Sequence, residues 1–204
     1  MNHSQLLRRI AAVACSAALV FSLAGCSKET AASKKDTTAK SENTGSQSEK
    51  DAPKVPDGPL TEESYTQLLQ GYYDKLMEAS SQASQEFEAI NKATTDDAKK
   101  KQLEYAMGLF ENVQTLYDPF IDIKAPDSFT EAQTLISSGA SASQEVLRLT
   151  VKMSRLLADE NKIAEARVVE KEISNHTKDQ QKFSQGLAMV LGDSVGVGDP
   201  IKTE

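Results

Sequence analysis

The sequence predicts an all-α fold, an up-down-up-down four-helix bundle that follows a signal peptide and a disordered linker. Two observations favour this fold. Apolar residues recur at alternating steps of three and four along four stretches of residues 59–192, the pattern of amphipathic helices. The connections between the stretches are short, and short connections between helices of similar length favour antiparallel neighbours.

The first two helices are predicted by capping residues and apolar stripes. Thr61 is an N-cap residue with acids directly after it, and residues 94–97 (TTDD) end the first helix and cap the second. We expect the second helix to end at Pro119. The first stripe consists of Tyr65, Leu68, Tyr72, Leu76, Ala79, Ala83, Phe87 and Ile90; the second consists of Leu103, Ala106, Phe110, Val113 and Tyr117.

The third helix follows a short apolar connection at residues 120–127 (FIDIKAPD). Ser128 and Glu131 have the spacing of a capping box. Its stripe consists of Ala132, Leu135, Gly139, Ala142, Val146, Leu149, Met153 and Leu156.

The fourth helix begins after a break at residues 159–161 (DEN), and Gly192 is placed to end it. Its stripe consists of Ile163, Ala166, Val169, Ile173, Phe183, Leu187 and Val190. The alternative is that residues 159–161 do not break the helix, which would give one very long helix and a dimeric assembly.

The amino end has the pattern of an export signal. Arg8 and Arg9 precede an uncharged apolar run at residues 10–23 that is shorter than the roughly 20 residues of a membrane-spanning helix. Leu23, Ala24, Gly25 and Cys26 follow, and this closely resembles the lipobox of bacterial prolipoproteins. The resemblance implies cleavage before Cys26, a lipid on its thiol, and attachment to the cell membrane on the extracytoplasmic side. The alternative is an ordinary secretory signal with a chance cysteine.

Four segments follow from these patterns. Residues 1–25 are the lipoprotein signal peptide, 26–58 the lipid-anchored disordered linker, 59–192 the four-helix bundle and 193–204 a flexible tail. The linker lacks aromatic residues and balances six lysines with six acids, so it cannot bury enough apolar surface to fold. Cleavage removes two arginines and no acid, which leaves 21 basic and 30 acidic residues, a net charge of −9. An acidic domain is not attracted to anionic lipid, so the lipid anchor must hold it.

A small-residue layer is predicted at the middle of the bundle, where three helices lose their large apolar residues. Reflecting the chain about its turns places four residues near one level: Ala83, Ala106, Ala142 and His176. In one interpretation His176 fills the space that the alanines leave. In the other, the layer is a hydrated pocket in which His176, Gln180 and Ser141 hold a small polar ligand.

Other chemistry finds little support in the sequence. It contains no metalloprotease, P-loop, nucleophile-elbow or CxxC motif, and both cysteines lie within the first 26 residues. Its net charge of −7 disfavours nucleic-acid binding. Asp118, Asp122 and Asp127 lie near one connection, but their spacing matches no EF-hand, and acids near turns are usually caps. We therefore expect no enzyme activity, cofactor or metal.

The functional expectation is a lipid-anchored, non-enzymatic helical lipoprotein that acts by contact with an unknown protein or envelope component. The alternative is a small-molecule binding module that uses the pocket around His176. Residues 124–133 (KAPDSFTEAQ), which enter a helix of small residues, resemble a pattern in uncharacterised helical lipoproteins of Gram-positive bacteria. That resemblance implies fold and location, and it carries no catalytic residue.

Overall fold

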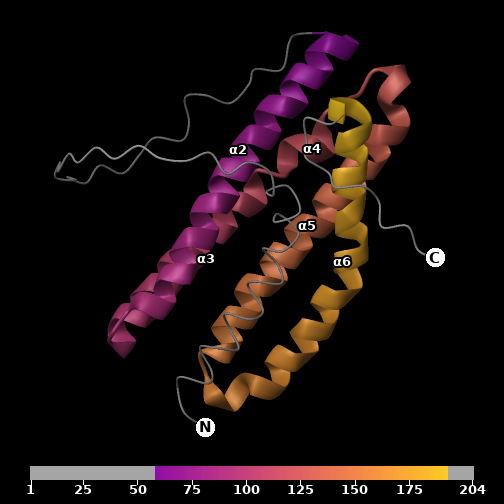
Figure 1. The fold of residues 1–204 in the computed structure, drawn as a ribbon. Helices are drawn as coiled ribbons and strands as arrows, with labels where there is room; N and C mark the ends of the chain where they lie inside the picture. The colour runs from indigo at the N-terminus through magenta and orange to yellow at the C-terminus, as the bar shows by residue number, and fades with distance from the viewer. Residues whose placement is uncertain (1–57, 193–204) are drawn as a thin grey trace, which may run out of the picture.

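Four long α-helices make up most of the chain in the computed structural model, which describes residues 58–192 (Figure 1). The helices are α2 (Glu62–Ala89), α3 (Asp96–Thr115), α5 (Thr130–Leu157) and α6 (Ile163–Leu191). The prediction of an all-α fold with four helices is confirmed for this part of the chain, in which no strand occurs. The predicted signal peptide, the lipidation site Cys26, nearly all of the linker and the predicted tail lie outside the described residues.

The helices form two hairpins, one of α2 with α3 and one of α5 with α6, whose members lie side by side (Figure 1). Consecutive long helices run in opposite directions. The hairpins meet around the short helix α4 (Asp118–Asp122) and diverge toward their turns, which lie well apart at the lower end of the view. The bundle is therefore closed at the α4 end and open at the turn end.

The first two helices begin where the sequence predicts. The Thr61 side chain accepts a hydrogen bond from the Ser64 amide at 3.2 Å, and the Ser64 hydroxyl accepts one from the Thr61 amide at 2.9 Å, which makes a reciprocal capping box. Thr95 caps α3 by accepting from the Ala98 amide at 3.2 Å. Both caps act within three residues, so they need no tertiary contact to form.

Two predictions around the second connection are wrong. Pro119 does not end a helix. It lies in the first turn of α4, where backbone N–H groups have no partner within the helix, so the missing N–H of proline costs no hydrogen bond. Ser128 does not cap α5: a 3-10 turn (Asp127–Phe129) runs directly into the helix, and the N-cap residue Phe129 makes no side-chain bond. A capping serine needs extended backbone in front of the helix, and the turn takes that place.

The last connection and the end of α6 follow the sequence. Asp159 has extended backbone between α5 and the 3-10 turn η4 (Glu160–Lys162), and its carboxylate accepts from the Asn161 amide at 3.0 Å. The alternative of one continuous helix through residues 159–161 is therefore wrong. Gly192 ends α6 with a φ of +60°, a conformation that costs other residues more than glycine.

The helices α5 and α6 pack with their backbones unusually close. A Cβ built on Gly139 would lie 2.1 Å from the Phe183 amide nitrogen, and one on Gly186 would lie 2.7 Å from the Ala132 carbonyl oxygen. Neither position has room for a side chain. The absence of a side chain at Gly139 and Gly186 therefore permits the close packing of α5 and α6.

Most residues of the predicted apolar stripes are buried. The exceptions outside α5 are partly buried: Ala79, Ile163, Ile173 and Val190. Ile136 and Leu157 are buried, whereas Leu135 and Leu156, which the sequence places in the stripe, are only half-buried. The core centres on Phe120 of α4. Its ring lies 5.9 Å from that of Tyr72 and 5.0 Å from that of Phe183, so it joins α2 to α6.

Tyr65 links three elements at the closed end of the bundle. Its hydroxyl donates to Gln133 Oε1 at 2.6 Å, and Gln133 Nε2 in turn donates to the Phe120 carbonyl at 2.8 Å. Burial raises the pKa of Tyr65 to about 12. The folded state therefore holds this proton to higher pH than the unfolded chain, in which a tyrosine titrates near 10.

This pKa difference predicts alkaline destabilisation. The contribution of Tyr65 is fully present below about pH 10 and is lost as the pH rises toward 12, because only the unfolded chain ionises readily in that range. We expect the free energy of unfolding, measured by urea denaturation at pH 8 and pH 11, to fall, and Tyr65→Phe to reduce the fall by about 1 kcal/mol. Tyr105→Phe, at an exposed tyrosine, is the control. An identical fall in both variants would contradict the prediction.

Candidate functional site

The three residues of the predicted central pocket differ in their surroundings. Ser141 is exposed, and its hydroxyl donates to the Ser137 carbonyl of its own helix at 3.0 Å. Gln180 is buried, and His176 is half-buried. The structure thus places Ser141 at the surface, Gln180 in the core and His176 at the boundary between them.

The contacts between α5 and α6 define the level of each residue. Gly139 lies against Phe183, and Gly186 lies against Ile136. Counting along both helices from these contacts places Ala142 level with Gln180. The prediction placed His176 level with Ala142. In the structure, His176 lies about one helical turn closer to the connection between α5 and α6.

His176 lies near an ion pair on the neighbouring helix. Arg148 and Glu145 are joined at 2.6 Å, and this hydrogen bond is the main reason that the pKa of Glu145 lies below its ordinary value. Positive charge on His176 and Lys152 lowers this pKa further. The surroundings of His176 are therefore charged.

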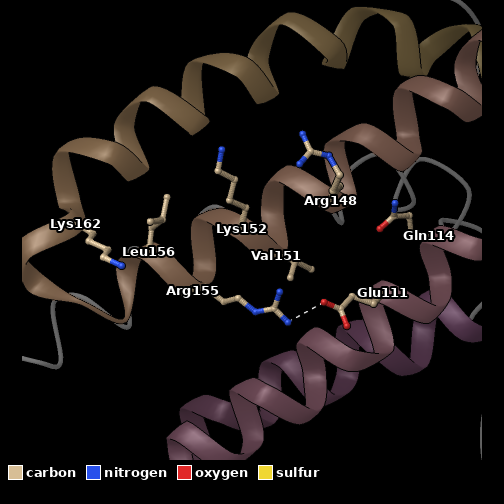
Figure 2. Close-up of a pocket in the computed structure, with 8 residues that line it drawn as sticks. All are labelled: Glu111, Gln114, Arg148, Val151, Lys152, Arg155, Leu156 and Lys162. Carbon is tan, nitrogen blue, oxygen red and sulfur yellow. Dashed lines mark hydrogen bonds and ion pairs between the residues drawn. The ribbon is translucent and has the colours of Figure 1, made fainter.

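A different site lies where the two hairpins diverge. A cavity of about 320 Å³ opens between α3 and α5, and Figure 2 shows the side chains that line it. Four of them are cationic: Arg148, Lys152, Arg155 and Lys162. Val151 and Leu156 supply apolar wall, and α3 contributes Glu111 and Gln114. We call this cavity the cationic cleft.

One ion pair crosses the cleft between the hairpins. Arg155 of α5 donates to Glu111 of α3 at 2.8 Å, as the dashed line in Figure 2 shows. Both side chains are about half exposed, so the pair contributes at most about 1 kcal/mol. Such a bond is weak enough to be exchanged for another anion.

The remaining two cations are Lys152 and Lys162. Among the described residues, no ion pair holds Lys152 or Lys162. Glu145 pairs with Arg148, and the charge of Glu172 also acts on Arg148, so four cations meet three carboxylates here, a local net charge of +1. The chain as a whole has a net charge of −7, so the cleft is opposite in sign to the protein that carries it.

The cationic cleft was not predicted, although the sequence of α5 contains a signal for it. Arg148, Lys152 and Arg155 follow one another at steps of four and three, which places them on one helix face. From residue 146 to residue 157 the chain has no acid. The part contributed by α3 had no sequence signal, because it depends on where the hairpins diverge.

Asp118, one of the three acids near the second connection, is bonded to a neighbouring helix. Its carboxylate accepts from Gln144 Nε2 at 2.5 Å. Within residues 58–192, no three His, Cys, Asp or Glu side chains gather as a metal site would need.

Comparison with known proteins adds no assignment. No family model, curated protein or solved structure matches this chain. In the described residues, no helix combines the length and the apolar character that crossing a bilayer requires.

Proposed function

We propose that this chain is a lipoprotein, anchored through Cys26 on the extracytoplasmic side of the cell membrane, whose helical bundle acts without catalysis by contact with a protein or envelope component. The observation that carries the proposal is the order of signals at the amino end. A pair of arginines, an uncharged apolar run and then Leu23, Ala24, Gly25 and Cys26 follow one another without interruption.

The energetics of acyl chains support an anchor at this position. Each buried CH₂ contributes roughly 0.8 kcal/mol, so two or three chains at Cys26 hold a protein stably where one chain binds reversibly. Cleavage before Cys26 would leave a net charge of −9, which offers no attraction to anionic headgroups. Attachment then depends on the lipid.

A spacer between anchor and bundle follows from the residue numbers and composition. The first long helix begins at Glu62, so residues 27–61 separate it from Cys26. Treated as a flexible coil, such a segment has a root-mean-square reach of roughly 30 Å. We propose that it holds the bundle clear of the headgroups, where its faces are free to meet a partner.

The test replaces each of the two cysteines in turn. Cys26→Ser is expected to remove lipidation, so that the protein remains uncleaved or is released into the medium. Cys15→Ser is the matched control, because it removes a thiol inside the predicted signal peptide and should change neither lipidation nor location. Fractionation of cells and mass spectrometry of the amino-terminal peptide are the measurements.

Two results would overturn the anchor. One is tight attachment of Cys26→Ser to the membrane, equal to that of the unmodified sequence. The other is a mature protein whose amino end carries no lipid. Loss of attachment in Cys15→Ser but not in Cys26→Ser would mean that Cys15 carries the lipid. That result would also overturn an anchor at Cys26.

A further inference from the structure

The cationic cleft gathers more positive charge than its own acids neutralise. Arg148, Lys152, Arg155 and Lys162 line a cavity of about 320 Å³, and only Glu111 supplies negative charge to its lining. Like charges three and four residues apart on one helix face repel one another, which costs a little stability unless a counter-charge is supplied. No packing role explains the arrangement, because Lys152, Arg155 and Lys162 are exposed.

The spacing of the cations suits a ligand with more than one negative group. Arg148 and Arg155 lie seven residues apart on α5, which is about 10 Å along the helix axis. Lys152 lies between them on the same face, and Lys162 approaches from the turn at the end of α5 (Figure 2). A single carboxylate would meet only part of this row.

The size and chemistry of the cleft point to phosphate. Its volume lies at the lower end of the range of small-molecule pockets, roughly 300–1,000 Å³. A ligand that fits this volume and neutralises four cations must carry several negative charges on few atoms. Phosphate groups do this better than carboxylates. Arginine forks also match phosphate oxygens in a bidentate way.

We propose that the cationic cleft binds an anion that carries at least two phosphate groups. Lys152 and Lys162 supply the first contacts. Arg155 exchanges its weak bond to Glu111 for the ligand, and this exchange links binding to the separation of the two hairpins. The inference does not depend on the lipid anchor, because it rests only on α3, α5 and the turn that follows α5.

Inorganic pyrophosphate is the probe for the first test. Isothermal titration calorimetry on the full chain carrying Cys26→Ser, in neutral detergent at low salt, is expected to show binding. Adding Lys152→Gln with Lys162→Gln should raise the Kd at least about tenfold, because two charge-assisted contacts are lost. Lys100→Gln with Lys101→Gln is the matched control: it makes the same change in net charge at exposed positions of α3 outside the cleft and should change the Kd less than about twofold.

A second variant tests the exchange at Glu111. Glu111→Gln removes the carboxylate that competes for Arg155, so the Kd for pyrophosphate should fall about threefold or more. Circular dichroism should remain unchanged, because the pair is half exposed. Weaker binding in this variant would mean that Glu111 does not compete with the ligand, and would overturn the exchange.

The source of the phosphate is distinguished by competition. Adding phosphatidylglycerol to the detergent micelles should weaken pyrophosphate binding if neighbouring lipid headgroups occupy the cleft, and should leave it unchanged if the ligand is a soluble phosphate. In both cases the cleft is supported if Lys152→Gln with Lys162→Gln weakens pyrophosphate binding as expected above. Absence of pyrophosphate binding, or equal binding by the two double-lysine variants, would overturn the proposal.

Discussion

Gly139→Ala is expected to destabilise the bundle by about 3 kcal/mol or more. The added Cβ would lie 2.1 Å from the backbone nitrogen of Phe183, far inside contact distance, and backbone cannot rotate away as a flexible side chain does. The helices α5 and α6 must then separate, which loses packing along both. Urea denaturation followed by circular dichroism measures the loss.

Gly108→Ala is the matched control for this substitution. Gly108 lies within α3, and a Cβ there meets no atom within 4 Å. Because alanine has the higher helix propensity, this variant should be more stable than the original by about 0.5–1 kcal/mol. A change of less than about 0.5 kcal/mol in Gly139→Ala would contradict the close approach of α5 and α6.

Phe120→Ala has the second large expected effect, a loss of about 3–5 kcal/mol. Phe120 is fully buried in the five-residue helix α4 and contacts the rings of Tyr72, Tyr117 and Phe183. Removing it opens a cavity where the two hairpins meet. The urea unfolding transition of the variant should move to lower denaturant and should also broaden if the hairpins then unfold separately.

Tyr105→Ala is the control for Phe120→Ala. It also removes an aromatic ring, but Tyr105 is 51% exposed on α3. We expect a change within about 0.5 kcal/mol. Equal losses from the two substitutions would mean that α4 does not hold the hairpins together.

The helix ends that the sequence predicts correctly depend on local bonds. Thr61 and Thr95 bond to amides three residues ahead, and Asp159 bonds to the amide of Asn161. Because donor and acceptor lie within one turn of chain, the residue types are enough to place them. The same pattern misled at Ser128, where the 3-10 turn before α5 replaces the extended backbone that a cap requires.

The sequence predicted less well which residues of neighbouring helices lie side by side and which face of α5 is buried. Both depend on contacts between helices. The prediction paired residues that are equally far in sequence from a turn, which assumes that the two helices of a hairpin begin at the same distance from it. Gly139 instead lies against Phe183, which brings Gln180 to the level at which His176 was expected. In α5 the buried face includes Ile136 and Leu157 rather than Leu135 and Leu156, because the contacts of its neighbours decide which side of a broad apolar stripe is covered.

By itself, the sequence determined the four helices, the breaks between them and the lipobox that we propose as the anchor, since each depends on residues close together in the chain. Tertiary structure alone decided the angle at which the hairpins diverge, and with it the cationic cleft. Three of its four cations, Arg148, Lys152 and Arg155, form a row on one helix. Glu111 joins it from α3, 44 residues away from Arg155, because packing around Phe120 holds the two hairpins together near α4 while they diverge toward their turns.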